Sequence, residues 1–449
     1  NTASGAQSFV TGESNKAEGL DSAAFGKQAT AKGSYSIAAG HGAQANGAVS
    51  AAFGTDTVAS GQNSFTAGMS TKATQWNATA LGERTQANGR NSLATGLNTT
   101  ASGNTSTAMG METKAEGIGA VATGHNTIAK GEYSFSMGER TEAQGTRAVA
   151  TGYATKAMGV NSFTAGENTQ AEGRNSVATG YKTKATGTNA AAFGEGSEAT
   201  GAVSFTAGLN NKASGQSLTA LGNLSQATGA ASFAGGLRTE ASGVASTAMG
   251  DSTKATGVIS TAMGWKTEAS GQQSTAIGTL SKSSVHSSFA AGSETEASGA
   301  YSLATGNNTE SVGENSFSGG LRSQAIGDSS LAFGVDSKAK GRYAVALGEG
   351  STASGKAATA LGENSTAKGN NSFASMGGFA QGNNSLALGR GAFAQIDDSY
   401  AIGAGNTIGS ATVMTTTEAN GSGAGADQDN ITTVTDGTVK GNMSGAFGY

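Results

Sequence analysis

The 449-residue sequence contains no cysteine and no proline. The lack of cysteine excludes disulfides and thiol chemistry. The lack of proline excludes a collagen helix, although glycine accounts for 72 residues. Charged residues make up only 13% and the net charge is −4, so nothing indicates binding to nucleic acid or to an anionic membrane. No stretch of about 18 apolar residues is present that would span a bilayer as a helix.

Glycine instead recurs at regular places. The segment 5–368 divides into 26 consecutive 14-residue repeats, without insertion or deletion. Counting from Gly5 as position 1, position 1 is glycine in 24 repeats and position 13 is alanine in 24. Position 8 is glycine in all 26, and these predicted turn glycines include Gly12, Gly26, Gly40, Gly180 and Gly278.

Each repeat has two short segments, at positions 4–7 and 11–14, separated by glycine corners. Segments this short are typical of strands and too short for average helices. Glycine provides the turn conformations that other residues avoid. Two strands in every repeat therefore predict an all-β fold, a β-solenoid of two-stranded coils.

The side-chain volumes at positions 5 and 7 compensate for each other. Phe65 is followed by Ala67, whereas Ala23 is followed by Phe25. Such compensation is expected where two side chains share one confined interior. We therefore expect positions 5 and 7 to face inward, opposite the alanine of position 13, with positions 4 and 6 forming an outer surface suited to a second chain. The predicted core residues are Phe9, Phe25, Phe53, Phe65, Phe163, Phe205 and Phe233.

The tryptophans and tyrosines of the repeats lie at corner positions 2, 3 and 9. Both residue types are enriched in binding hot spots, although single exposed aromatic residues are also normal on any protein surface. The candidate ligand-contacting residues are Trp76, Tyr133, Tyr153, Tyr181, Trp265, Tyr301 and Tyr343.

Positions 4 to 8 read Ser-x-Ala-x-Gly, as in SVATG (Ser176–Gly180), STAIG (Ser274–Gly278) and SLALG (Ser385–Gly389). This motif resembles the head repeat of YadA-type trimeric autotransporter adhesins, over residues 1–409. The resemblance implies a left-handed parallel β-roll, a parallel homotrimer and display at the cell surface, from a Gram-negative outer membrane. It also implies self-aggregation and binding to extracellular matrix, such as collagen, or to host cells.

The sequence departs from the family pattern in two places. The repeat at 369–381 is one residue short, and residues 410–449 form a Thr- and Gly-rich segment without the repeat. We expect residues 1–409 to form the head repeats. Residues 410–449 fit a cap, a loop or the start of another module, and we expect any membrane anchor to lie outside this chain.

No catalytic, cofactor-binding or metal site is predicted. The three histidines, His41, His125 and His286, occupy corners far apart along the chain and are expected to be solvated turn residues. Asp427 and Asp429 offer oxygen ligands for calcium but lack an EF-hand pattern, so a polar loop is the alternative.

Position 12 carries Lys or Glu in eight of nine successive repeats and Gln in the other. Stacked coils place these side chains about 4.8 Å apart, which predicts a cross-strand charge ladder. A polar stripe that faces a ligand is the alternative. The residues are Lys184, Glu198, Lys212, Gln226, Glu240, Lys254, Glu268, Lys282 and Glu296.

We therefore predict a non-catalytic, oligomeric adhesin head. A structural shaft, in a phage tail fibre or a self-assembling extracellular filament, is the principal alternative. Ice binding is disfavoured because the threonines at positions 5 to 7 never align over many repeats. A polysaccharide-degrading enzyme is disfavoured because the acidic residues are scattered along the coils.

Overall fold

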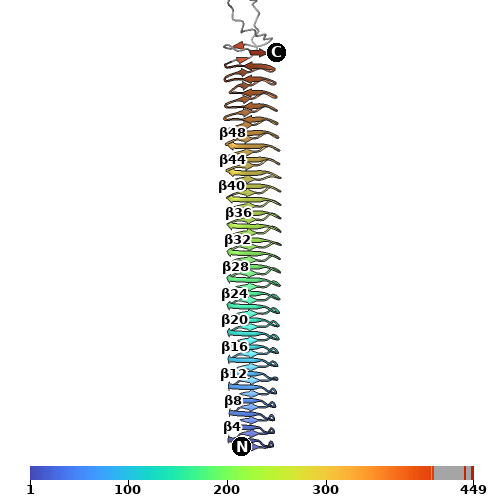
Figure 1. Cartoon of the computed structure of the whole chain (residues 1–449), viewed down its shortest axis with the longest axis vertical. Helices are drawn as coiled ribbons and strands as arrows, with labels where there is room; N and C mark the ends of the chain where they lie inside the picture. Colours follow the sequence, from blue (N-terminus) through green and yellow to red (C-terminus); the bar gives the residue numbers. More distant parts are fainter. Residues whose placement is uncertain (406, 409–438, 441–445, 449) are drawn as a thin grey trace, which may run out of the picture. The chain divides into compact units, whose positions relative to one another are not determined.

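The computed structural model describes residues 1–405, 407–408, 439–440 and 446–448. All regular secondary structure among these residues is β-strand. The chain divides into two compact units, residues 1–224 and 225–449. Each unit is a roll of stacked two-stranded coils (Figure 1), so the predicted all-β solenoid is confirmed.

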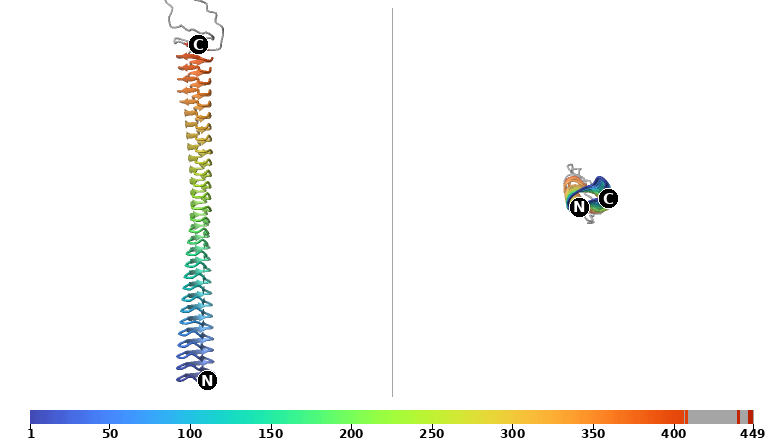
Figure 2. Two further views of the ribbon diagram at one scale, coloured as in Figure 1. Left: turned by 90° about the vertical axis from the view of Figure 1, so that its right-hand side faces the viewer. Right: turned by 90° about the horizontal axis from the view of Figure 1, so that it is seen from below.

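One coil of the first unit illustrates the architecture. A long strand, β26 (Val177–Tyr181), covers positions 5–9, and a short strand, β27 (Lys184–Ala185), covers positions 12–13. Strand β26 pairs in parallel with β28 (Ala191–Glu195), and β27 pairs in parallel with β29 (Glu198–Ala199). The long strands thus form one sheet and the short strands a second, and the coils follow each other in sequence order (Figure 2).

The strands repeat these positions through both units. In the first unit the long strands run from β2 (Phe9–Glu13) to β32 (Thr219–Asn223). In the second unit they begin at β34 (Phe233–Leu237) and keep the same length up to β48 (Leu331–Val335). From β50 (Val345–Leu347) they become shorter, because the chain turns directly after position 7.

The shortened repeat at 369–381 does not interrupt the sheets. Strand β53 (Thr366–Ala367) pairs with β55 (Phe379–Ala380), so the short-strand sheet continues across the deletion. The missing residue falls in the turn after β54 (Phe373–Ser375), where Met376 is 74% exposed. A turn absorbs the deletion because it lies at the surface, where the chain path can change without disturbing the strands. The turn still bonds to its neighbours: the Met376 N–H donates a 3.1 Å hydrogen bond to the Leu361 carbonyl oxygen of the preceding coil.

The last coil of the second unit pairs with two short strands from the end of the chain. Strand β58 (Ser399–Ile402) pairs antiparallel with β61 (Ala446–Gly448), and β59 (Thr407–Ile408) pairs antiparallel with β60 (Val439–Lys440). The remainder of the segment 410–449 lies outside the described residues. No helix suited to crossing a membrane occurs in the part of the chain that the structure describes.

Small side chains fill the inside of each roll. In the coil described above, Ser176, Ala178, Thr183 and Ala185, at positions 4, 6, 11 and 13, are all fully buried. Side chains alternate between the two faces of a strand, so positions 4 and 6 share the inner face. The inward placement of the position 13 alanine is confirmed. Ala, Ser and Thr occupy the interior in coil after coil, and Leu218, at position 4, is among the largest side chains that are fully buried there.

The prediction that positions 5 and 7 form the core of the roll is wrong. These positions lie on the outer face of the long-strand sheet, where Phe9 is 56% and Phe205 38% exposed. The narrow interior accounts for the reversal, since it has no space for a phenyl ring. The prediction that positions 4 and 6 face outward is wrong for the same reason. The misassigned residues are Phe9, Phe25, Phe53, Phe65, Phe163, Phe205 and Phe233.

Volume compensation has a different origin, on the outside of the roll. The ring centroids of Phe9, at position 5, and Phe25, at position 7 of the next coil, lie 5.5 Å apart. Phe193 and Phe205 pack in the same diagonal way at 5.6 Å. Alternation between positions 5 and 7 therefore staggers bulky groups on coils that are only one strand spacing apart.

In some coils the serine of position 4 caps the corner from inside, whereas in others, such as those of Ser36 and Ser162, its hydroxyl has no hydrogen-bond partner. The Ser176 Oγ donates a hydrogen bond of 2.6 Å to the carbonyl oxygen of Gly173, and Ser22 does the same to Gly19 at 2.7 Å. These bonds satisfy the buried hydroxyl and a turn carbonyl together. At position 8, Gly180 has a φ of +121°, and an added Cβ would collide with the carbonyl oxygen of Gly194.

Strand β27 provides a direct test of which side is the interior. We expect Ala185→Leu to lower the free energy of unfolding by about 1–3 kcal/mol or to prevent folding, because the larger side chain overpacks a filled interior. The adjacent, exposed Lys184→Leu is the matched control and should have a much smaller effect. Chemical unfolding followed by circular dichroism measures both; equal destabilisation would contradict this assignment.

Candidate functional site

The outer surface of each unit consists of two faces and two corners. We call the outer side of the long strands, at positions 5 and 7, the apolar face. The outer side of the short strands, at positions 12 and 14, is the polar face. The first corner comprises positions 2–3, and the second corner comprises positions 9–10, on the other side of the long strand.

The apolar face carries bulky groups in successive coils. Phe163, Phe205 and Phe289 are each more than a third exposed, and Leu, Met, Val or Ile occupies positions 5 or 7 in most other coils. Monomeric soluble proteins rarely expose contiguous apolar patches of more than a few hundred Å². The apolar side chains of this face thus remain in contact with water along the coils of each unit.

The polar face aligns the side chains at position 12. Strand pairing sets Lys184 opposite Glu198, and Glu198 opposite Lys212, as the repeat predicts. No ion pair joins these three residues, all of which lie in the described part of the chain. Pairing continues where the signs no longer alternate, because Glu296 lies opposite Glu310. The alignment of the ladder is thus confirmed, whereas its electrostatic attraction contributes little.

The first corner holds four of the predicted ligand-contacting residues. All four side chains are about half exposed, and three of them have a close neighbour. The guanidinium of Arg90 lies 5.0 Å from the Trp76 ring, that of Arg342 lies 4.9 Å from the Tyr343 ring, and His286 meets Tyr301 edge-on at 5.2 Å. The four residues are Trp76, Tyr133, Tyr301 and Tyr343.

The second corner holds Tyr153, Tyr181 and Trp265, which are 37%, 37% and 42% exposed. Each ring has a cation beside it, from an adjacent coil or from the next residue. The Arg140 guanidinium lies 5.7 Å from the Tyr153 ring, and its Nη1 donates a 2.6 Å hydrogen bond to the tyrosine hydroxyl. The Lys266 Nζ lies 4.4 Å from the Trp265 ring.

The structure brings only one pair of these described aromatic residues close together on one corner. Tyr153 lies opposite Glu167 in the long-strand sheet, and Glu167 lies opposite Tyr181, so the tyrosines are two coils apart. Within each unit, the other predicted aromatic residues that share a corner are separated by more coils. The constant repeat length predicts this register, whereas the cations beside the rings depend on side-chain conformations that the sequence does not reveal.

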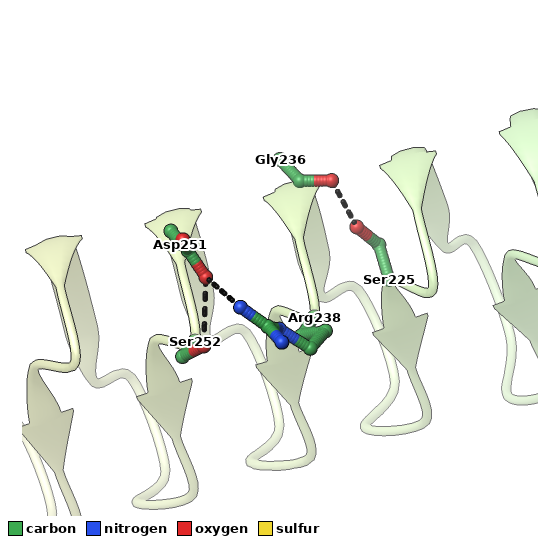
Figure 3. Close-up of polar contacts among 5 residues, drawn as sticks. All are labelled: Ser225, Gly236, Arg238, Asp251 and Ser252. Carbon is green, nitrogen blue, oxygen red and sulfur yellow. Dashed lines mark hydrogen bonds and ion pairs between the residues drawn. The ribbon is translucent and has the colours of Figure 1, made fainter.

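Polar contacts between coils also order the second corner. The Arg238 Nη2 donates a 3.1 Å hydrogen bond to the Asp251 carboxylate, which also accepts one from the Ser252 hydroxyl (Figure 3). These hydrogen bonds, first from Ser252 and then from Arg238, lower the pKa of Asp251. Both nitrogens of the Arg322 fork bind Asp336 at 2.7 Å and lower the pKa of that carboxyl in the same way.

The histidines form no metal centre. The His125 Nδ1 lies 3.9 Å from the Glu139 carboxylate, and among the described residues no three His, Asp or Glu side chains are placed to hold a metal ion. Asp427 and Asp429, which we considered for calcium, lie outside the described residues.

One concave site was missed in the sequence. A depression of about 460 Å³ opens at the shortened repeat, between Glu363 and Asn364 on one side and Arg390 on the other, with Met376 and Gly377 at the deletion. The break in the repeat was the available signal. It was interpreted only as a loss of register, because a deletion does not reveal whether the turn closes or leaves a gap.

Comparison with protein families gives one result. A family model described as the YadA head domain repeat matches several segments, which together cover well over half of the chain. The matched residues are 3–55, 73–155, 157–183, 185–202, 241–309, 325–351, 353–375 and 380–406. No curated protein matches the chain.

Corner exposure can be measured on the native protein, because Trp76 and Trp265 are the only tryptophans. We expect red-shifted emission and efficient acrylamide quenching before unfolding, with little further red shift on denaturation, since both indoles contact water. Trp76→Phe and Trp265→Phe variants assign the signal to each corner. Blue-shifted, protected emission from either residue would show that its corner is covered in the assembled protein.

Proposed function

Because the chain belongs to the family of YadA head domain repeats, an adhesin-type family of surface proteins, we propose that it attaches cells to host extracellular matrix or to other cells without catalysis. The observation that carries this proposal is repetition. Each unit presents the same two faces and two corners in every coil, with aromatic residues at the corners.

Repetition favours attachment through many weak contacts. A fibrous matrix protein or a crowded cell surface also repeats its binding groups, so several coils can engage at once. Multivalent engagement raises effective affinity by roughly 10²–10⁴-fold without any new type of contact. The same repetition supports self-aggregation between cells that display the protein.

We also propose a parallel homotrimer held together by the apolar face. Exposed rings such as Phe163 and Phe205 lose their contact with water when copies pack side by side, and burying one such ring is worth about 1.5–3 kcal/mol. The faces of three identical chains meet in register. In most coils a large residue at one of positions 5 and 7 is accompanied by a small one at the other, which leaves room for a neighbouring ring; Phe135 with Met137 is an exception. This interface replaces the one predicted at positions 4 and 6.

The proposed location is the bacterial cell surface, displayed from a Gram-negative outer membrane by an anchor outside this chain. The polar face and the corners are suited to an aqueous exterior, since their side chains are mainly charged, amide or hydroxyl groups.

The trimer proposal predicts how charged substitutions on the apolar face change the oligomeric state. We expect light scattering to give three times the chain mass of 43.6 kDa. The triple variant Phe163→Glu, Phe193→Glu and Phe205→Glu should dissociate to smaller species, because the carboxylates would be buried unpaired.

The matched control reverses charge on the polar face of neighbouring coils, with Lys156→Glu, Lys184→Glu and Lys212→Glu. This variant should remain trimeric. A monomeric wild-type protein, or the same dissociation in both triple variants, would refute an interface on the apolar face.

Attachment is tested with the purified protein on surfaces coated with collagen, fibronectin or laminin, and with cells that display it. We expect binding to at least one surface. The apparent affinity of the trimer should be at least about 10²-fold higher than that of the dissociated variant with glutamate at positions 163, 193 and 205. No binding to any surface and no cell aggregation would count against adhesion and favour a structural shaft.

A further inference from the structure

We propose that the second corner of the coils spanning residues 125–196 binds an extended polysaccharide of β-linked hexopyranoses. This inference rests on the proposed attachment function, because it names a ligand class for it. The site is the position 9 column of six successive coils, where the residue type alternates between a ring and a carboxylate. In order, the residues are His125, Glu139, Tyr153, Glu167, Tyr181 and Glu195.

The strand register makes this alternation a straight row. Each member lies opposite the next in the long-strand sheet, without interruption from His125 to Glu195. Adjacent members are therefore about 4.8 Å apart, and the two tyrosines about 9.6 Å apart. Tyr153, Glu167, Tyr181 and Glu195 are all exposed.

Neighbouring cations hold the tyrosine rings in place. Arg140 donates a 2.6 Å hydrogen bond to the Tyr153 hydroxyl, and the Lys182 Nζ lies 4.7 Å from the Tyr181 ring centroid. Rings that are oriented before the ligand arrives lose less conformational entropy on binding. The row is thus a pre-arranged series of flat apolar surfaces separated by hydrogen-bond acceptors.

The chemistry of the row specifies the ligand. An ionised carboxylate only accepts hydrogen bonds, so the groups that face Glu167 and Glu195 must be donors. The groups that face the tyrosines must present a flat C–H surface. A pyranose ring has hydroxyl donors around its edge and C–H groups on its face. In an extended β-linked chain each sugar advances by about one coil and every second sugar presents the same face, which matches the tyrosine spacing.

A polyproline II chain also fits the spacing, because one turn of that helix rises about 9.3 Å. The carboxylates decide against it. A proline-rich backbone has few N–H donors and exposes carbonyl oxygens, which are acceptors and cannot pair with Glu167 or Glu195. Acidic polysaccharides are disfavoured as well, since three glutamates of the row outnumber the two cations beside it, Arg140 and Lys182.

The row remains accessible in the proposed trimer. Position 9 carries ionised side chains in this region, and enclosing Glu139, Glu167 and Glu195 between copies would remove their charges from water, which is strongly unfavourable. Positions 5 and 7 of the same coils carry no ionisable residue, so the apolar face can be covered while the corner stays in solvent.

The test is calorimetric titration of the intact protein with cellohexaose and with chitohexaose, with an α-linked glucan as the specificity control. We expect binding of at least one β-linked oligosaccharide and none of the α-linked chain. The double variant Tyr153→Ala and Tyr181→Ala should lose at least tenfold in affinity. Tyr35→Ala and Val49→Ala, which remove two exposed side chains from the first corner, should bind as the wild type does. Circular dichroism confirms that both double variants are folded.

Three results would overturn the inference: no binding of either oligosaccharide at millimolar concentration, equal loss in both double variants, or binding of a Pro-Pro-Gly repeat peptide at this row in place of the sugars. Its failure is distinguishable from failure of the proposed function. Matrix or cell attachment that persists without oligosaccharide binding refutes the sugar site alone, whereas loss of all attachment refutes the adhesin.

Discussion

The narrow spacing between the two sheets of each roll is the constraint on which the rest of the structure depends. Coils are joined by parallel backbone ladders, and the space between the sheets admits Ala178 and Ala185 but no ring. Buried apolar area per coil is consequently small, because an alanine removes little surface from water. Stability must come mainly from the continuous backbone hydrogen bonding, and this requires every coil to have nearly the same path. This requirement explains why position 8 is always glycine in the 26 repeats, because a Cβ there would collide with the next coil.

The large apolar residues are therefore placed outside. Phe9 and Phe25 pack on each other across coils and yet remain in contact with water, so an isolated roll leaves its largest hydrophobic groups partly unburied. The interior and the outer faces therefore have separate roles. The interior determines the path of the chain. In the proposed trimer the apolar face drives association, which leaves the polar face and the corners for solvent and ligands. Assembly in such a protein completes the burial that a globular domain achieves within one chain.

The repeat was sufficient to predict the fold, since glycine corners at this short, constant interval permit few other structures. It was not sufficient to predict which side faces inward, because alternation along a strand defines two faces without identifying the buried one. Invariance was the better guide: small side chains at positions 4, 6 and 13 recur because the interior is nearly the same in every coil, whereas positions 5, 7 and 9 vary.

The Ser176 hydrogen bond to Gly173 explains a serine whose role was not evident from the motif. The corner aromatics were identified as exposed candidates, and the constant repeat length aligns Tyr153 with Tyr181. The cations beside the two rings depend on side-chain conformation, and the depression at Met376 depends on how one turn absorbs a deletion.

The side chains that determine the fold are different from those on the outer surface, so the surface can vary without changing the fold. No side chain at position 9 contributes to the interior, so Tyr153 or Trp265 can be exchanged without disturbing the ladders that hold the coils together. A ligand-binding row needs only a few successive coils with suitable side chains, because the backbone already supplies their spacing and alignment. Different stretches of the same roll can then carry different surfaces, such as the tyrosine–glutamate row in the first unit and the Arg322–Asp336 pair in the second. Under the two proposals, binding specificity is local and additive along the coils, while association, which depends on the whole apolar face, is collective.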